Sequence, residues 1–558
     1  MDVTTAWLKP PSKAGGLDHL GIQQPPTRIF STLLPGLTVV TDRVSNYSFY
    51  PWVIWAHLQD GGQVGLDFVH TLRRAECLLT LIAERHAEVT GEAKLLHSLG
   101  LVGRNTLAPA LREDARRPIP LGELAALRSE NSNSYFKNRY GGLGQYYLGS
   151  LRELGILDRV GERVECSEDI GIPLAIALDA RVDRSAFFRI VKRGLAVEKD
   201  LDRLHSLCPC HLAAHTPERE LLIDLLFARK VKPTTTDELR RQTLLLLLDL
   251  AFRRGRVGEA PLDVVFRAAC LTGSIDGGVV WTPPEKWLRV RRAWATYERN
   301  DELSIAVLGI FWTALRLLDE RDGRAESARE VGALVSEAAS AVLPMARALT
   351  LREAIEETAR SLPPLPNWDN EKHEFQRSQY VRASARDRDL PGCLLAALDT
   401  LLAIGARHSE PQPYLEVGIP PDYLNDYPLN LLSFHRKVSG EWRELRLADW
   451  AGTLASEWGV EAHLRVALRK LHHESLDKFL LYVTDEGIRR RQDAEPPLPG
   501  FTASRVDRAV RFLVDLGLAT WQQAEDATDL EDDEAVYQGA SVARISSLGR
   551  QVLEAFRG

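Results

Sequence analysis

Cysteine is scarce in this chain. Only six of its 558 residues are cysteines, and one pair alone, Cys208 and Cys210, lies close together in the sequence. Small proteins held together by disulfides carry many more cysteines in a much shorter chain. A disulfide framework is therefore excluded as the basis of the fold, and we expect a reducing compartment, the cytoplasm.

Long hydrophobic runs are also missing. The leucine run Leu244 to Leu248 is already broken at Asp249, whereas a helix that crosses a bilayer needs about 20 apolar residues. The first residues, Met1 to Thr4, have neither the basic start nor the apolar core of a signal peptide. We therefore expect neither a membrane span nor a membrane partner.

The motifs of several common enzyme classes are absent. The chain has no Gly-Lys dipeptide, which excludes the phosphate-binding loop of nucleotide hydrolases, and no Gly-x-Ser-x-Gly, His-Glu-x-x-His, Cys-x-x-Cys or Gly-x-Gly-x-x-Gly. A nuclease that uses scattered Asp, Glu and Lys residues stays open as an alternative. The shortage of strand patterns argues against it, so we expect a protein that is not an enzyme.

The residues that are present favour helices. Leu, Ala, Arg and Glu are abundant, with 45% hydrophobic and 26% charged residues. At about 150 residues per domain, the length predicts several domains. The net charge of −7 neither requires nor excludes a nucleic-acid partner, because binding needs only a local basic patch.

The densest aromatic stretch is Tyr47 to His57. It could line a ligand pocket, or it could be a helix whose rings anchor the preceding Pro- and Gly-rich arm to the core. We expect burial, because aromatic clusters mostly contribute buried apolar area.

Two segments share one order of elements. Leu-Arg-Glu-Leu-Gly-Ile-Leu at 151–157 parallels Leu-Val-Asp-Leu-Gly-Leu-Ala at 513–519. In each, a helix that ends at glycine is followed by a strand, a turn, a second strand and a serine-capped helix. This pattern resembles the winged-helix superfamily, in particular the second half of the multiple-antibiotic-resistance-regulator type, near 119–178 and 470–556.

The resemblance completes the expected fold class: a mainly α, multi-domain helical protein with two small winged-helix (α+β) units. The predicted divisions are 1–118, an N-terminal arm and helices; 119–215, a winged-helix-like unit; 216–360, a helical domain; 361–430, a proline-rich linker with helices; and 431–558, a C-terminal winged-helix-like unit.

The first winged-helix candidate carries residues suited to nucleic acid. Cations bind phosphates, while Tyr and Gln can stack on bases or reach their edges. The expected contacts gather before and at the start of the third helix: Lys137, Arg139, Tyr140, Gln145 and Tyr146, with Tyr135 and Phe136 nearby.

The second candidate offers Arg505, Arg508 and Arg511, which we expect on or beside an exposed helix face. Its wing holds seven acidic residues between Glu525 and Glu534, which would repel a phosphate backbone. This unit is therefore more suited to binding a protein.

One stretch resembles a metal site. Five potential ligands lie within residues 205–215: His205, Cys208, Cys210, His211 and His215. Thiolates and imidazoles are the ligands that zinc prefers, and a structural site needs four. However, one residue separates the two cysteines, where zinc motifs usually have two to four. We therefore expect a compact loop with no cofactor, and zinc held by Cys208, Cys210, His211 and His215 as the alternative.

A pair of carboxylates is expected to be unremarkable. Glu298 and Glu302 share a helix face, but no Glu-x-x-His motif accompanies them, so we expect a solvated face and not a di-iron site.

Three further stretches, Tyr47–Ala56, Tyr427–Lys437 and His463–Leu471, are similar to an uncharacterised bacterial family often encoded beside phage-defence or mobile-element genes. Three functions remain open. The first is a non-enzymatic nucleic-acid-binding and/or scaffolding component of a bacterial multi-protein system, possibly phage defence, whose partners are DNA or another nucleic acid and other protein subunits. The second is a subunit that contacts only proteins, and the third is a nuclease with an unrecognised metal-dependent site.

Overall fold

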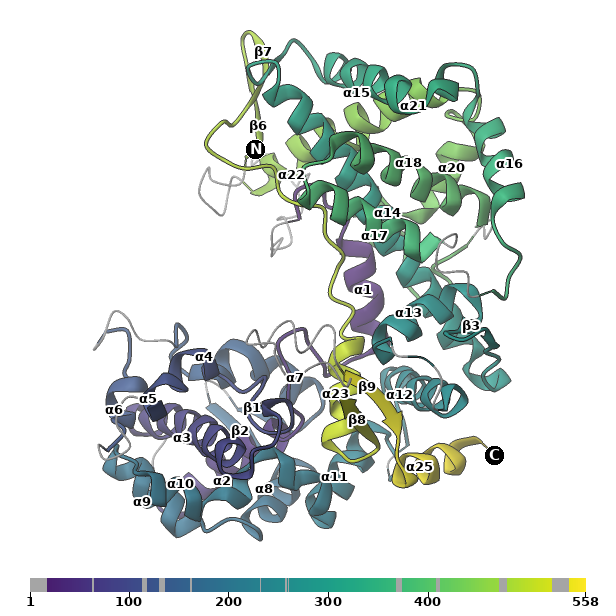
Figure 1. The fold of residues 1–558 in the computed structure, drawn as a ribbon. Helices are drawn as coiled ribbons and strands as arrows, with labels where there is room; N and C mark the ends of the chain where they lie inside the picture. Colours follow the sequence, from purple (N-terminus) through teal and green to yellow (C-terminus); the bar gives the residue numbers. More distant parts are fainter. Residues whose placement is uncertain are drawn as a thin grey trace, which may run out of the picture. The chain divides into compact units, whose positions relative to one another are not determined.

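The computed structural model describes residues 18–62, 65–112, 118–129, 136–160, 163–230, 232–255, 258, 260–367, 374–407, 412–470, 479–523 and 541–557. Helices dominate these residues, and the strands form small sheets of two or three members (Figure 1). The composition-based prediction of a mainly helical, multi-domain protein is thus confirmed.

The chain divides into two compact units. Unit 1 comprises Met1–Phe30, Arg267–Thr282 and Arg289–Ala503, and unit 2 comprises Ser31–Phe266, Pro283–Leu288 and Ser504–Gly558. Both units are therefore discontinuous in sequence. The finer division predicted from the sequence stays a prediction.

Unit 1 is built around a helix of 32 residues, α14, whose interior is buried on all sides. Beside it, α17 packs on α18, and α15 packs on α21 and η7 (Figure 1). The helical elements are α1 (Gln24–Leu33), α13 (Leu262–Thr272), α14 (Leu288–Asp319), α15 (Ala328–Val342), η6 (Pro344–Arg347), α16 (Leu351–Ser361), α17 (Glu374–Arg386), α18 (Leu390–Arg407), α19 (Pro421–Asp426), α20 (Leu431–Ser439), α21 (Leu447–Thr453), η7 (Leu454–Glu461) and α22 (Ala462–Lys470). Three of them cross the unit boundary: α1, α13 and, by its first residue, α14.

Unit 1 also has two small antiparallel sheets that the sequence did not predict. One pairs β3 (Ser274–Ile275) with β4 (Val279–Val280). The other has the order β5-β7-β6, from β5 (Arg324–Ala325), β6 (Leu481–Thr484) and β7 (Gly487–Arg490). The strands β3, β4 and β5 have only two residues each, too few to show an alternating pattern.

Unit 2 holds the remaining elements, and its long helices are α3 and α12. They are α2 (Asn46–Gln59), α3 (Leu66–Thr90), η1 (Lys94–Leu96), α4 (Arg104–Leu107), α5 (Pro109–Arg112), α6 (Leu121–Leu124), η2 (Leu143–Tyr147), α7 (Leu148–Glu153), β1 (Leu157–Val160), β2 (Arg163–Cys166), α8 (Gly171–Asp179), α9 (Arg184–Arg193), α10 (Glu198–Arg203), η3 (His205–Leu207), η4 (Pro209–Ala214), α11 (Thr216–Leu226), α12 (Thr235–Arg254), η5 (Glu285–Trp287), α23 (Val506–Asp515), β8 (Ala519–Gln523), β9 (Ser541–Ile545) and α25 (Ser547–Arg557).

The two segments with the shared order of elements also share their local geometry. Gly155 and Gly517 end the preceding helices with the same φ of +69°, a conformation that glycine adopts without strain. The strands that follow pair as antiparallel hairpins, β1 with β2 and β8 with β9. The strand prediction for 156–166 and 518–545 is confirmed.

The serine after each hairpin makes the same two hydrogen bonds. Ser167 donates to the carbonyl of Gly155 at 2.6 Å and accepts from the amide of Gly171 at 2.9 Å. Ser546 donates to the carbonyl of Gly517 at 2.6 Å and accepts from the amide of Gly549 at 3.0 Å. The two segments are therefore local structural repeats, which is what the shared sequence pattern implied; the winged-helix assignment itself stays a prediction.

The aromatic stretch forms α2 and is buried. Tyr47, Tyr50 and Trp52 are at most 1% exposed, and Tyr47 donates a hydrogen bond of 2.6 Å to the carbonyl of Gly36. The stretch therefore anchors the preceding arm, as expected, and supplies burial.

One described helix, α18, is long and apolar enough to span a membrane by length and composition. Half of that span is buried, and the helix packs against α15, α16 and α17. No multi-span pattern appears among the residues that the structure describes.

Candidate nucleic-acid interface and a histidine–cysteine cluster

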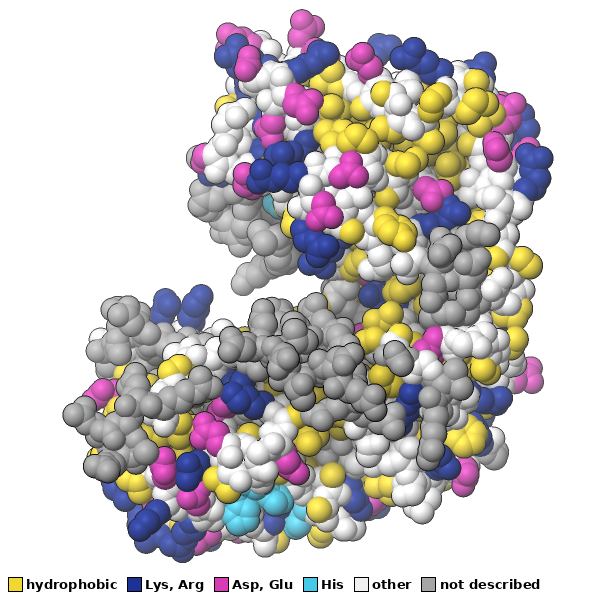
Figure 2. Space-filling model, in the orientation of Figure 1, with side chains coloured by type: hydrophobic (Ala, Val, Ile, Leu, Met, Phe, Trp, Pro, Cys, Tyr) yellow, Lys and Arg dark blue, Asp and Glu magenta, His cyan; other side chains and the backbone are white. Residues whose placement is uncertain are grey.

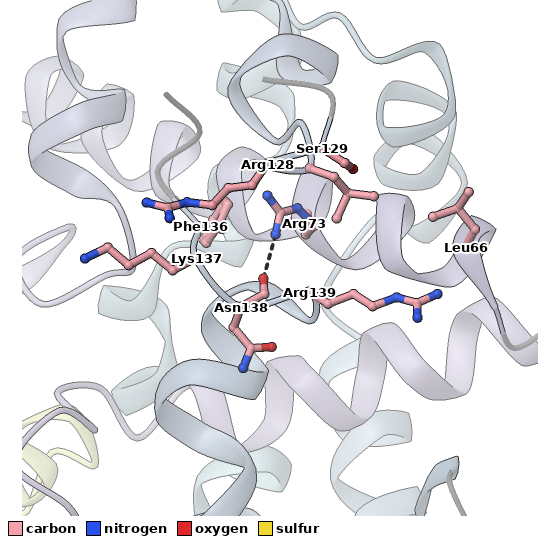
Figure 3. A pocket seen from close by; sticks show the side chains of 9 residues that line it. Leu66, Arg73, Arg128, Ser129, Phe136, Lys137, Asn138 and Arg139 are labelled. Atoms are coloured by element: carbon pink, nitrogen blue, oxygen red, sulfur yellow. Dashed lines mark hydrogen bonds between the residues drawn. The ribbon is translucent and has the colours of Figure 1, made fainter. Parts of the chain in front are cut away.

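A basic hollow of about 350 Å³ opens on unit 2. Arg73, Arg128, Lys137 and Arg139 line it, and none of its described lining residues is acidic. Figure 3 shows Arg128 and Lys137 extending to one side and Arg139 to the other. The other lining residues are Leu66, Leu127, Ser129, Phe136 and Asn138.

Arg73 holds together the two segments that line this hollow. It lies on α3, is fully buried, and donates hydrogen bonds to the carbonyl oxygens of Ala125 and Asn138, both at 2.7 Å, and of Ala126 (Figure 3). Its guanidinium also lies 4.9 Å from the centroid of the Phe136 ring. Arg73 thus links residues 125–126, which follow α6, to the segment that carries Lys137 and Arg139.

A second buried group on α3 holds the end of the same segment. Glu76 is 2% exposed and accepts hydrogen bonds from the amides of Gly142 (2.9 Å) and Leu143 (2.8 Å). Burial raises the pKa of Glu76 to about 7, against the opposing effect of these hydrogen bonds. Gly141 has φ +58°, and a Cβ there would lie 2.2 Å from Glu76 Oε2, so the turn requires glycine.

The structure leaves the predicted nucleic-acid contacts of this segment accessible. Lys137, Arg139 and Gln145 are exposed, and Tyr140 is 36% exposed. Tyr146 is half-buried, and its hydroxyl accepts a hydrogen bond of 2.6 Å from the Gln145 amide. Phe136 is instead buried, and Tyr135 lies outside the described residues. The sequence missed Arg73 and Arg128, which neither adjoin the others closely in sequence nor carry a motif.

The three arginines of the second candidate lie elsewhere than expected. Arg505 donates to the carbonyl oxygens of Leu34 and Leu37, and Arg508 pairs with Asp42. Arg511 is only 3% exposed, with a guanidinium nitrogen 3.7 Å from Asp42. These side chains therefore pack against the arm of unit 2 and not on an exposed helix face. The acidic stretch 525–534 lies outside the described residues.

A histidine–cysteine cluster forms where three segments of unit 2 meet. Single ligand atoms of His86, His97, Cys208 and Cys210 all lie within 4.8 Å of one another. His86 comes from the last turns of α3, His97 follows η1, and the cysteines flank the start of η4. The cysteines were candidates from the sequence; the two histidines lie more than 100 positions away, and only the fold brings them close.

Hydrogen-bond distances link the members in pairs. His97 Nδ1 lies 3.3 Å from Cys208 Sγ, and His86 Nδ1 lies 3.4 Å from Cys210 Sγ. The other nitrogen of His97, Nε2, lies 2.9 Å from Glu92 Oε2. Cys208 and His97 are fully buried, whereas His86 and Cys210 are half-buried.

The electrostatics distinguish the two thiols. The hydrogen bond from Cys208 and the neighbouring His97 lower the pKa of Cys210 far below its usual range. Burial raises the pKa of Cys208. These opposite shifts favour Cys210 over Cys208 as the thiolate of the pair.

The three histidines that the sequence offered as ligands, His205, His211 and His215, are outside this group of four. The His211 ring stacks on His86 with centroids 5.1 Å apart, and His205 lies 5.6 Å from His86. Figure 2 shows histidine side chains gathered at one place on the surface of unit 2. His215 lies 3.7 Å from the buried Glu218, so it belongs to a different contact.

The expectation of a solvated face at Glu298 and Glu302 is wrong. Both side chains are fully buried in α14, and Arg267 pairs with Glu298 at 2.9 Å and with Asp301 at 3.1 Å. A helix enclosed on all sides brings its polar positions inside as well, and for Glu298 the ion pair with Arg267 offsets part of the lost hydration.

Comparison with protein-family models, with curated proteins and with solved structures found no match to this chain.

Proposed function

We propose that this protein is a non-enzymatic nucleic-acid-binding component of a larger protein assembly, and that it contacts the nucleic acid with the segment around residues 128–146. The observation that carries the proposal is the basic hollow: three exposed cations, Arg128, Lys137 and Arg139, surround it, and no described lining residue is acidic.

Each accessible residue has a role in this proposal. The three cations contact phosphates and displace bound counterions, which gives affinity without sequence preference. Tyr140 and Tyr146 offer aromatic faces for stacking, and Gln145 can reach a base edge. Arg73 is a positioning residue, because its donors bind carbonyl oxygens of the segment.

We assign no nucleic-acid contact to Arg505, Arg508 or Arg511. Arg508 and Arg511 lie against Asp42, and Arg505 is bound by backbone carbonyls. A phosphate would have to compete with these partners. The C-terminal winged-helix-like segment that carries them is more suited to contacts with other protein subunits. We place the assembly in the bacterial cytoplasm and, from the family resemblance, in phage defence.

The test is a binding titration of the full-length protein with labelled duplex DNA and single-stranded RNA at two salt concentrations. The Lys137→Ala/Arg139→Ala variant should weaken binding to all sequences. It should also make the fall of log affinity with log salt less steep, by about two in the slope, one for each lost phosphate contact. The matched control is Arg189→Ala/Lys192→Ala, which removes two exposed cations from α9 of the same unit; it should leave both quantities unchanged.

Unchanged affinity in the Lys137/Arg139 variant would refute this interface. Absence of binding by the wild-type protein would favour the alternative of a subunit that contacts only proteins. Cleavage of the nucleic acid that depends on Mg²⁺ would refute the non-enzymatic part of the proposal and favour the nuclease alternative.

A further inference from the structure

We propose that His86, His97, Cys208 and Cys210 bind one zinc ion in a closed, structural site. The inference is independent of the nucleic-acid interface, because it rests on a different group of residues and is measured by a different property. It revises the sequence-based expectation of a compact loop without a cofactor, since two ligands come from outside that loop.

The distances fit a tetrahedral metal site. With zinc about 2.3 Å from sulfur and about 2.0–2.1 Å from nitrogen, a sulfur and a nitrogen ligand are separated by about 3.6 Å. The two measured separations, 3.3 Å for His97–Cys208 and 3.4 Å for His86–Cys210, are close to this value. Two independent thiol–imidazole hydrogen bonds would not require all four atoms to lie within 4.8 Å of one another.

Glu92 supplies the outer contact that zinc-bound histidines commonly have. Its carboxylate lies 2.9 Å from His97 Nε2. A proton held on Nε2 leaves the lone pair on Nδ1, the atom beside Cys208, free to bind a metal. The contact with Glu92 therefore favours the tautomer of His97 that coordination requires.

The chemistry of the ligands selects the ion. Two thiolates and two imidazoles suit zinc, whereas magnesium and calcium prefer oxygen ligands. Two thiolates also neutralise the charge of a divalent ion, which allows burial beside the fully buried Cys208 and His97. The half-buried His86 and Cys210 leave an entry path from the surface.

The ligand count assigns a structural role. All four tetrahedral positions are filled by side chains, so no position remains for a reactive water. The ion would join the end of α3, the residue after η1 and the start of η4. Because η1, η3 and η4 are short 3₁₀ segments, with few internal hydrogen bonds to hold them, a bound ion would fix their positions.

The first measurement is the zinc content of the full-length protein, purified without a polyhistidine tag and dialysed after zinc supplementation. We expect one equivalent per chain. Replacement by Co²⁺ should give the visible absorption of a tetrahedral site with sulfur ligands. Removal of the metal by a chelator should lower the melting temperature.

Variants then test the ligands. Cys208→Ser/Cys210→Ser and His97→Ala should each lose the metal and the Co²⁺ spectrum. Two matched controls should retain them: Cys77→Ser, a buried cysteine on α3, and His211→Ala, whose ring stacks beside the site. Loss of zinc in the His211 variant would refute the assignment of the four ligands.

A measurement on the wild-type chain covers the case in which the variants do not fold. Zinc should protect Cys208 and Cys210 from alkylation, and a chelator should expose Cys210 first because it is half-buried. The half-buried Cys166, on β2, should react equally with and without metal. Zinc far below one equivalent in the supplemented protein, or alkylation of Cys210 that ignores zinc, would overturn the proposal.

Discussion

The buried carboxyl of Glu76 predicts how the stability of unit 2 depends on pH. Burial raises its pKa to about 7 in the fold, from 4.5 in the unfolded chain. The folded state therefore binds the proton more tightly than the unfolded state. The stability that protonation contributes is present below pH 4.5 and is lost as pH rises through about 7.

The size of the effect follows from the two pKa values. Over the full window, a shift from 4.5 to about 7 corresponds to about 3 kcal/mol, at about 1.4 kcal/mol per pKa unit. Between pH 5 and pH 8, proton linkage gives a fall of about 2.5 kcal/mol in the free energy of unfolding from this one group. Arg73 and Tyr50, which face the carboxyl, oppose the shift, and the pKa of about 7 already includes their effect.

The assay is urea unfolding at pH 5 and pH 8, read by a hydrogen-exchange pulse on peptides from α3, so that unit 2 is observed by itself. Glu76→Gln should remove most of the difference between the two pH values, because glutamine does not titrate. It should also lower stability at both, since one of the amides of Gly142 and Leu143 loses its acceptor.

The control is Glu123→Gln, which replaces an exposed glutamate on α6 and should leave the pH dependence unchanged. Two results would contradict the reasoning. In one, Glu76→Gln keeps the full difference in unfolding free energy between pH 5 and pH 8. In the other, the wild-type protein gains stability relative to the Gln variant between pH 5 and pH 8, which would show that the carboxyl is ionised in the fold.

Two further predictions concern packing and capping. Gly332→Ala should destabilise unit 1 by about 1–3 kcal/mol in urea unfolding, because the added Cβ would lie 2.6 Å from the carbonyl oxygen of Gly452. The control, Gly149→Ala, adds a Cβ in open space on α7 and should be neutral or stabilising. A loss of stability in this control would contradict the packing argument. Thr234→Ala should lower the free energy of unfolding by about 1 kcal/mol, since it removes the hydroxyl that exchanges hydrogen bonds with Asp237 at the start of α12. An unchanged urea midpoint would show that this cap does not contribute to stability.

The sequence by itself determined the local structure. The repeated Leu-x-x-Leu-Gly pattern at 151–155 and 513–517 predicted a helix end and a hairpin, and both are present with the same φ of +69° at the glycine. The serine expected to cap the last helix, Ser546, directly precedes the start of α25. These signals depend on hydrogen bonds between residues a few positions apart, which the order of residues fixes directly.

Burial and long-range proximity were decided by the tertiary structure. Periodicity placed Arg505, Arg508 and Arg511 on the polar side of α23, but residues 34–42 cover that side and accept their hydrogen bonds. Glu298 and Glu302 have a solvated-face pattern, yet α14 is enclosed on all sides. A helix pattern shows which residues share a face, and only packing shows what that face meets.

The histidine–cysteine cluster shows the same limit most clearly. The sequence marked Cys208 and Cys210, and His86 and His97 carried no signal, because neither has a second ligand at a recognisable spacing. Only the packing of α3 and the segment after η1 against η3 and η4 brings their ring nitrogens within 4.8 Å of the sulfurs. Metal coordination depends on distance in space, and that distance is set by the fold and not by separation along the chain.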